Sequence, residues 1–410
     1  MKRRGPLLLT LAVLFWPAAA APSSLVAPPI AGQASPPHPA ATQAARPREA
    51  ARPKVRLITT GGTIANQAGG RLSAEQLIEL VPQLKDYVRP ETEQFSNVSS
   101  SSLTLGQWLA LSRRLTAVVT EEPDLAGVVV TSGTDTLEEL AYFLHLTVRT
   151  EKPIVVVGAM RRPGVLGYEG AANLLQAFRV AADPQAGGKG TLVVLNDEIH
   201  SAREVTKTDA QRLNTFQTRG YGVLGIIDTD RIVFHYDLVK RHSARSEFDL
   251  AGVQTLPRVD VLLTYQDAPG DLLKAAADNG AKGIVLATAA GATSGTQSEG
   301  ALHALDKHVV IVRTTRTGSG RIAPADPDSR PPTSNTSASN TNNTSNTNNA
   351  AGATGNTGNS TSTPSAPSGS VWRNTVAGED LSPIKARILL MLALTRTTDV
   401  AQIQRMFREY

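Results

Sequence analysis

The chain has 410 residues, 41% of them hydrophobic and 4% aromatic, with 41 basic against 36 acidic side chains and a formal net charge of +5 at pH 7. This composition suits an ordinary α/β core, and the length allows two or three domains. There is no cysteine, which excludes disulfides, thiol nucleophiles, a lipoprotein anchor and cysteine-ligated metal.

The first 20 residues predict a secretory signal peptide. Three basic residues precede an apolar stretch from Leu7 to Trp16, and small residues follow at 18–20. We expect cleavage after Ala20, because the apolar stretch is too short to span a membrane. Removal of these basic residues lowers the formal charge to +2, so the sequence indicates no nucleic-acid partner and no stable membrane anchor. Residues 21–53 are rich in Ala and Pro and predict a disordered linker.

A short apolar strand follows the linker and ends in Thr60-Gly61-Gly62-Thr63-Ile64-Ala65. Two consecutive glycines let the backbone turn sharply and approach a ligand closely. The turn would hold Thr63 at the exit of a strand, where open α/β sheets bind ligands. A phosphate-binding loop is excluded, because no Lys followed by Ser or Thr comes after the glycines.

A second segment, Thr131-Ser132-Gly133-Thr134-Asp135-Thr136, repeats this design. It follows the apolar run Leu125 to Val130, which is typical of a strand buried on both faces of a parallel sheet. A helical pattern begins at Asp135, so its backbone N–H groups could hold a carboxylate or a developing oxyanion. Each segment alone is an ordinary strand-to-helix turn, since Thr and Asp cap helices. Together they indicate a pair of active-site threonines.

The rest of the chain predicts two α/β domains. Further apolar runs at 154–157 and 192–195 alternate with helical patterns, which favours a mostly parallel sheet flanked by helices. We expect a larger N-terminal domain at 54–236, a connection at 237–256 and a smaller C-terminal α/β domain at 257–410. An insertion at about 323–370, dominated by Asn, Thr, Ser, Gly and Pro, is predicted to be disordered.

The last part of the chain predicts two helices. Ser382 followed by Pro383 suits an N-cap and first turn, and one helical face is then lined by Ile384, Ile388, Leu389 and Leu392. Asp399 can begin the final helix. The seven histidines are scattered without metal-ligand spacing, so we assign no metal and no cofactor.

An ordered series of motifs resembles the secreted bacterial type II asparaginases and the related glutaminase-asparaginases. The resemblance extends from Lys54 to Tyr410, apart from the insertion. Besides the two threonine segments, the matching stretches are Val81-Pro82-Gln83-Leu84-Lys85-Asp86, Gly158-Ala159-Met160-Arg161, Leu195-Asn196-Asp197, Val205-Thr206-Lys207-Thr208 and Lys385-Ala386-Arg387-Ile388-Leu389-Leu390.

The resemblance implies catalytic roles. Thr63 matches the primary nucleophile, which would attack the side-chain amide carbon and form an acyl-enzyme. Thr134, Asp135 and Lys207 match a second catalytic group that activates a nucleophile or the water. A threonine hydroxyl needs a neighbouring base to accept its proton, and a partly neutral Lys207 could be that base.

The resemblance also implies substrate contacts. Ser100 would bind the substrate carboxylate, with Gly62, Thr134 and Asp135 beside it and Asp135 on the α-amino group. The serine run departs from the family at Ser101, where a Gln is usual. In the C-terminal domain, Asp267 stands where the family has an Asn that reaches substrate across a subunit boundary. No clear match exists for the Glu that a neighbouring subunit contributes.

The lid is a further departure. The family carries a loop with a tyrosine that folds over the nucleophile, whereas the segment Asn66 to Ser73 is short and has none. Gly69 and Gly70 would permit a hinge, and Arg71 is the candidate for its tip.

The expected activity is hydrolysis of L-asparagine to L-aspartate and ammonia by a periplasmic or secreted homotetramer that acts on a small amino-acid amide. A glutaminase-asparaginase of broader specificity is the nearest alternative. A catalytically weak amino-acid-binding member of the family is an alternative of another class, and hydrolysis of D-amino-acid or peptide amides also stays open.

Overall fold

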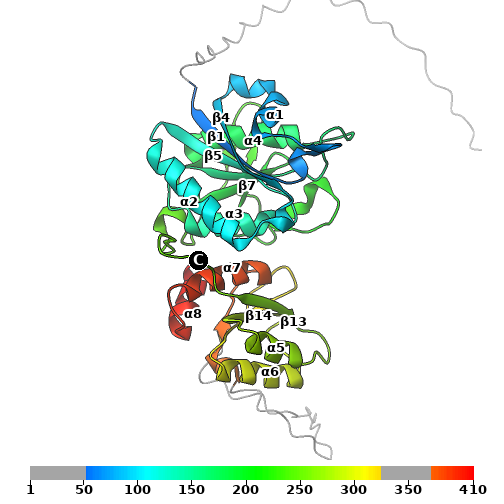
Figure 1. Ribbon diagram of the computed structural model, residues 1–410, viewed down its shortest axis with the longest axis vertical. Coiled ribbons are helices and arrows are strands. Elements are labelled where there is room, and N and C mark those ends of the chain that lie inside the picture. Colours follow the sequence, from blue (N-terminus) through cyan, green and yellow to red (C-terminus); the bar gives the residue numbers. More distant parts are fainter. Residues whose placement is uncertain (1–51, 325–370) are drawn as a thin grey trace, which may run out of the picture. The chain divides into compact units, whose positions relative to one another are not determined.

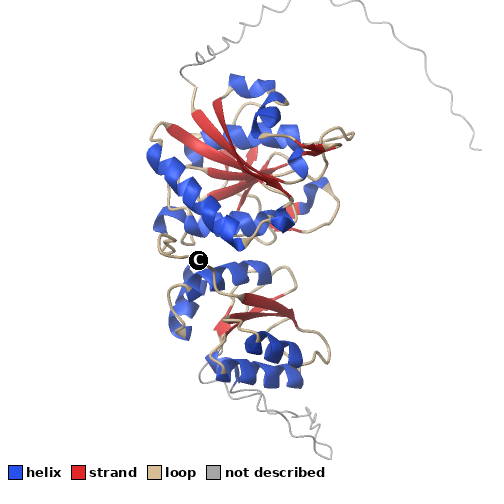
Figure 2. Cartoon of the chain, viewed as in Figure 1, coloured by secondary structure: helices blue, strands red, loops and turns tan. Residues whose placement is uncertain are grey.

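The computed structural model describes residues 52–324 and 371–410. The predicted signal peptide, nearly all of the predicted linker and nearly all of the predicted insertion therefore lie outside the described residues. The described chain contains two α/β domains, each built on its own sheet (Figures 1 and 2). The expected fold class is confirmed.

The larger domain contains an eight-stranded mixed sheet in the order β12-β11-β8-β7-β6-β5-β1-β4. The five strands from β4 to β7 in this order run parallel, and the remaining three pair antiparallel. The parallel strands are β4 (Arg89–Val98), β1 (Lys54–Gly61), β5 (Leu125–Thr131), β6 (Ile154–Val157) and β7 (Thr191–Leu195), and the antiparallel ones are β8 (Glu198–Ser201), β11 (Gly225–Ile227) and β12 (Ile232–Phe234).

Helices cover both faces of this sheet. Helices α2 (Leu105–Glu121) and α3 (Leu137–Thr147) share a core with Val128 and Val130 on one face. Helices α1 (Ala74–Glu79) and α4 (Gly170–Ala182) share another core with Val129 on the opposite face. Because successive strand residues point to opposite faces, a strand covered on both sides must be apolar throughout, as the expected runs are.

The smaller domain has four parallel strands in the order β13-β14-β15-β16. They are β13 (Val259–Leu263), β14 (Gly283–Thr288), β15 (Val310–Thr315) and β16 (Val376–Ala377). Helices α5 (Asp271–Asp278) and α6 (Gly295–Asp306) pack on one face of this sheet. Helix α7 (Pro383–Leu394) packs on the other, and α8 (Val400–Glu409) follows it.

Helix α7 is buried on more sides than the sequence pattern predicts. Eight of its twelve residues are buried, because it contacts the small sheet on one side and α3 of the larger domain on the other (Figure 1). The expected face is buried at Ile388, Leu389 and Leu392, and further residues of α7 are buried beside it. Ser382 and Pro383 begin α7 as expected, although the Ser382 side chain makes no capping hydrogen bond. Asp399 caps α8 by accepting from Gln402 N at 2.7 Å.

Two short ribbons complete the larger domain. Strands β2 (Asn66–Gln67) and β3 (Gly70–Arg71) form a hairpin directly after the first threonine turn. Strands β9 (Thr206–Lys207) and β10 (Phe216–Gln217) form the other ribbon. Among the described residues, no helix is long and apolar enough to cross a membrane.

Candidate active site

The two glycine-threonine turns lie against each other at the carboxyl ends of neighbouring strands. Strand β1 pairs directly with β5, and Thr60 fastens their ends by donating from its Oγ1 to the carbonyl of Thr131 at 2.7 Å. At Gly62 the φ angle is +87°, and a Cβ there would overlap the backbone N of Gly133. Only glycine permits this approach, so the turn chemistry expected from the sequence has a structural cause.

A small cavity of about 70 Å³ opens above the two turns. Its wall contains the expected residues Gly62, Thr63, Ser100, Thr134 and Asp135, which come from three separate strand ends. The wall also contains Asn66, Arg71, Ser99 and Gly133. The structure therefore brings together most of the residues predicted to act on the substrate.

Thr63 begins a short 3-10 turn, Thr63–Ala65, and is half-buried. This turn is held by Tyr168, whose hydroxyl donates to the carbonyl oxygen of Ile64 at 2.9 Å. Burial raises the pKa of Tyr168, so its hydroxyl stays a proton donor at neutral pH. Tyr168 is not identifiable from the sequence, since it lies in the loop between β6 and α4 and no local pattern relates it to Ile64.

Lys207 reaches the second threonine turn from β9. Its Nζ lies 3.0 Å from Thr134 Oγ1 and 2.9 Å from Asp135 Oδ1. The Lys207 side chain is 18% exposed, whereas that of Asp135 is 75% exposed. The three residues predicted as one catalytic group thus contact one another, with the amine shielded and the carboxylate open to the cavity.

The serine segment contributes unequally. Ser100 is buried, and a Cβ added to Gly133 would lie 2.6 Å from its Oγ. Ser101 is exposed and lies outside the cavity wall, where its Oγ is 3.3 Å from that of Ser99. Ser99 was not singled out by the sequence, because the register of four consecutive serines cannot be read from their pattern. The role expected of Ser101 stays a prediction.

Asp267 lies away from this cavity. It has a φ of +54° and lines a separate depression together with residues of α5 and α6. The single chain does not bring Asp267 to Thr63, and the expected contact requires a second subunit. That role also stays a prediction.

The hairpin that follows Thr63 is short and exposed. Its turn contains Ala68 and Gly69, while Arg71 pairs with Asn66 in strand β3. Arg71 is therefore at the base of the hairpin, not at the tip as the sequence suggested. From that position it lines the cavity and donates to the carbonyl of Asn97 at 3.4 Å.

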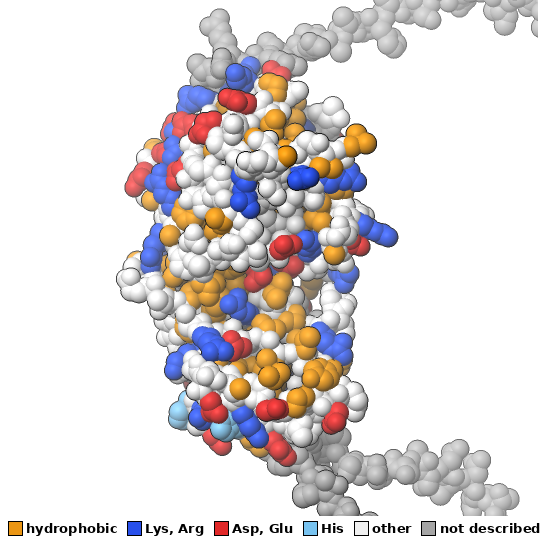
Figure 3. All heavy atoms as spheres, turned by 45° about the vertical axis from the view of Figure 1, so that its right-hand side comes forward, with side chains coloured by type: hydrophobic (Ala, Val, Ile, Leu, Met, Phe, Trp, Pro, Cys, Tyr) orange, Lys and Arg blue, Asp and Glu red, His pale blue; other side chains and the backbone are white. Residues whose placement is uncertain are grey.

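No group of three or more His, Asp or Glu among residues 52–324 and 371–410 could hold a metal ion. The buried histidines His145 and His242 stack on each other with ring centroids 4.8 Å apart. On the face shown in Figure 3, acidic and basic side chains are interspersed. The face shown therefore lacks the continuous basic stripe that tracks a phosphate backbone.

The geometry suits acyl transfer. Thr63 and Thr134 line the cavity, and the amine of Lys207 contacts Thr134 from outside its wall. Hydroxyls with a neighbouring amine, on turns that carry backbone N–H groups, are the types of group that such a reaction uses. A carboxylate at Asp135 can bind a cationic group of a ligand, and Ser100 can donate to an anionic one.

Comparison with known proteins gives consistent matches over both domains. Residues 54–240 match the family model "Asparaginase, N-terminal", and residues 258–348 match "Glutaminase/Asparaginase C-terminal domain". The chain is 37% identical over 369 residues to L-asparaginase 2 of Bacillus subtilis, covering 87% of each chain. It is 33% identical over 368 residues to a glutaminase-asparaginase of Pseudomonas fluorescens, covering 86% of this chain and 90% of that one.

A solved structure is similar as well. The crystal structure of a probable cytoplasmic L-asparaginase from Campylobacter jejuni superposes with a TM-score of 0.72 and is 32% identical in sequence. The match covers 88% of this chain and all of the other.

Proposed function

The chain belongs to the asparaginase family and is an amidohydrolase, and we propose that it hydrolyses the side-chain amide of L-asparagine with Thr63 as nucleophile. The observation that carries this proposal is the contact between the two threonine turns. Thr63 and Thr134 both line one cavity, and Lys207 hydrogen-bonds to Thr134, which supports a role for all three.

The first step is acylation. The Oγ1 of Thr63 attacks the amide carbon, its proton passes to a base, and the tetrahedral oxyanion is held by backbone N–H groups of the turns. The C–N bond then breaks, and the leaving nitrogen takes up a proton and departs as ammonia. The product of this step is an aspartyl ester on Thr63.

The second step is hydrolysis of that ester. Lys207 and Thr134 are the proposed groups that activate the water, which attacks the ester carbon and gives up a proton. The ester bond breaks, Thr63 regains its proton, and L-aspartate leaves. The support is the 3.0 Å separation between Lys207 Nζ and Thr134 Oγ1, within hydrogen-bond reach.

Substrate recognition follows from the polar groups in the cavity wall. We assign the α-carboxylate to Ser100 and the α-ammonium to the exposed carboxylate of Asp135, with Gly62 leaving room for the reacting amide. Ser101 and Asp267 stand as proposed outer contacts, and for Asp267 the contact would come from another subunit. Homotetramer formation and export to the periplasm belong to the same proposal, supported by the family resemblance and the signal-peptide pattern.

A glutaminase-asparaginase of broader specificity is the second candidate, favoured by the match to such an enzyme over 86% of this chain. A catalytically weak binding protein is the third, favoured by the absence of a tyrosine in the hairpin between Asn66 and Arg71. The cavity wall near Thr63 does not separate the two amides by itself, since they differ by one methylene.

Ammonia release from L-asparagine and L-glutamine, measured side by side on the purified protein, tests the proposal. We expect release from asparagine that Thr63→Ala abolishes while the thermal unfolding midpoint stays unchanged. Equal rates on both amides would favour the broader enzyme. Tight L-aspartate binding without ammonia release would favour the binding protein.

A further inference from the structure

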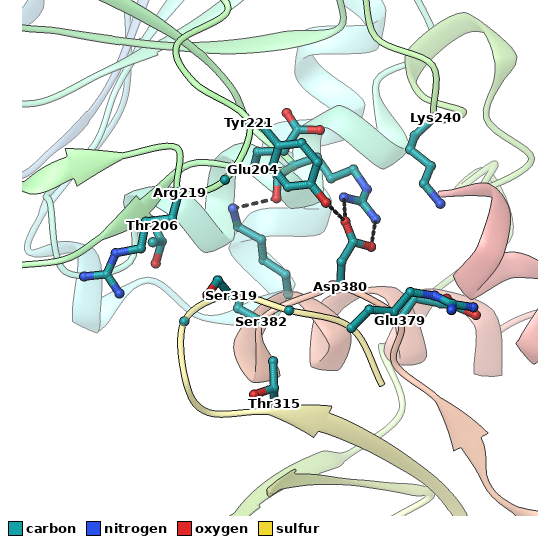
Figure 4. Close-up of a pocket in the computed structure, with 16 residues that line it drawn as sticks. Glu204, Thr206, Arg219, Tyr221, Lys240, Thr315, Ser319, Glu379, Asp380 and Ser382 are labelled. Atoms are coloured by element: carbon teal, nitrogen blue, oxygen red, sulfur yellow. Dashed lines mark hydrogen bonds and ion pairs between the residues drawn. The ribbon is translucent and has the colours of Figure 1, made fainter. Parts of the chain in front are cut away.

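The strand that carries Lys207 is held by residues of both domains. A cavity of about 510 Å³ lies beside this strand, with walls from the loops around Arg203 and Tyr221 in the larger domain and from Asp380 in the smaller one (Figure 4). Arg203 binds Asp380 through both guanidinium nitrogens at 2.9 and 2.7 Å, and the Tyr221 hydroxyl donates to the same carboxylate. This ion pair fixes the two domains at the point where β9 begins.

Lys385 of the smaller domain reaches deeper than the ion pair. It lies in the first turn of α7, is 2% exposed, and its Nζ donates to the carbonyl of Arg203 at 2.8 Å and to that of Val205. Val205 directly precedes Thr206 in β9, and Arg203 lies two residues earlier. A side chain of one domain therefore holds the backbone that leads into the proposed catalytic lysine of the other.

Glu138 of α3 holds β9 itself. Its Oε1 accepts from Lys207 N at 3.0 Å and from Thr206 Oγ1 at 3.1 Å. Its other oxygen, Oε2, lies 4.0 Å from Lys385 Nζ. The backbone at 203–207 is thus held by a buried cation and a buried carboxylate that face each other.

Packing alone does not explain why Lys385 and Glu138 are charged residues. The other buried residues of α7 are apolar, as expected for a helix whose main task is to join two hydrophobic faces. Burial lowers the pKa of Lys385 to about 8, so the side chain is still mostly a cation at neutral pH and needs its carboxylate partner. A buried ion pair of this kind fixes the positions of the groups that it contacts. Here those groups belong to β9 and to the residues just before it.

We propose that Lys385 and Glu138 are positioning residues for Lys207, holding β9 so that the Lys207 amine meets Thr134 and Asp135. The proposal rests on the proposed function of Lys207. It makes the docking of the smaller domain a requirement for the proton-transfer geometry in the larger one. Neither residue lines the cavity above Thr63.

The test compares Lys385→Met and Glu138→Gln with the parent protein, as kcat per L-aspartate-binding site. We expect each substitution to lower kcat about tenfold or more, while the Kd for L-aspartate changes less than about twofold, because the wall groups that bind it stay in place. The double variant should be no worse than either single one, since members of one network act non-additively. Lys240→Met is the matched control, because Lys240 lines the same large cavity but donates to a carbonyl of α8.

Unchanged kcat per site in both single variants would overturn the proposal, and so would an equal loss in Lys240→Met. A second measurement does not depend on activity. Hydrogen exchange at the amides of 205–208 should accelerate in Lys385→Met and in Glu138→Gln and not in Lys240→Met. If the parent hydrolyses neither amide, the proposed function fails, while the exchange data still decide whether this pair holds β9.

Discussion

The two threonine turns are alike in sequence and are held in different ways. The turn at Thr134 is supported by side chains, since Lys207 contacts Thr134 and Asp135 and Glu138 fixes the strand behind them. The turn at Thr63 is supported through its backbone, by Gly62 N donating to Val98 O at 3.0 Å and by Tyr168. An exposed hairpin follows it directly.

This difference separates two tasks. The proposed proton-transfer group needs fixed distances between polar atoms, which a charged network provides. The proposed nucleophile needs access to the substrate, and Thr63 lies on a short turn beside an exposed segment. We infer that substitutions around Thr134 impair proton transfer. Substitutions around Thr63 would instead displace its Oγ1 atom.

The largest effect is expected from Lys207→Met, which acts on the turn at Thr134. Methionine keeps the length of the side chain but offers no proton acceptor and no cation for Asp135, so kcat should fall about a thousandfold. Steady-state kinetics with L-asparagine and a calorimetric Kd for L-aspartate would separate this loss from weaker binding. Residual activity within a few-fold of the parent would remove Lys207 from the mechanism.

Tyr168→Phe probes the turn held through its backbone. The ring stays and one hydrogen bond to Ile64 O is lost, a change of about 1 kcal/mol, so kcat should fall about fivefold with little change in KM. Tyr236→Phe is the matched control, because the Tyr236 hydroxyl also donates to a backbone carbonyl, that of Gly222, at 2.8 Å. Equal effects of the two variants would show that Tyr168 acts on the fold in general and not on Thr63.

The smallest expected effect is a loss of stability in acid. It concerns the fold and not the two threonine turns, because neither turn contains a histidine. Burial lowers the pKa of His145 and of its stacked neighbour His242, the latter from 6.5 to about 4. Between pH 6.5 and about 4, His242 is protonated in the unfolded chain and neutral in the folded one. The free energy of unfolding should therefore fall as pH drops through this range. Urea unfolding at pH 7 and pH 5 measures this.

A variant makes the acid prediction specific. His242→Phe should show a flatter dependence of unfolding free energy on pH than the parent, since one of the two buried titrating rings is gone. An identical slope in both proteins would assign the acid sensitivity to other groups.

The sequence predicted the parts of the site that depend on local structure. The strands that end at Thr63 and Thr134 were predictable because strands buried on both faces are apolar throughout. The paired glycines were informative because a positive φ and a close backbone contact both require glycine. Lys207 was found through its motif, and its contact with Thr134 is a property of the fold.

The parts that failed depend on distant pairing. Tyr168 and Ile64 are 104 positions apart and come together only through the loop after β6. The burial of α7 on two sides was missed because the pattern of one helix does not show how many neighbours it will have. The role of Asp267 did not fail and stays a prediction, since the expected partner of this residue is a substrate bound by another subunit.

The double burial of α7 has a consequence for synthesis of the chain. Helix α7 is translated long after α3, and until it is made, α3 and the small sheet both lack the apolar surface that covers them. A nascent chain would expose the covered face of α3 over that whole interval, the condition under which chaperones bind and aggregation competes with folding. The synthesis of α7 thus sets the earliest point at which these two surfaces can be covered together.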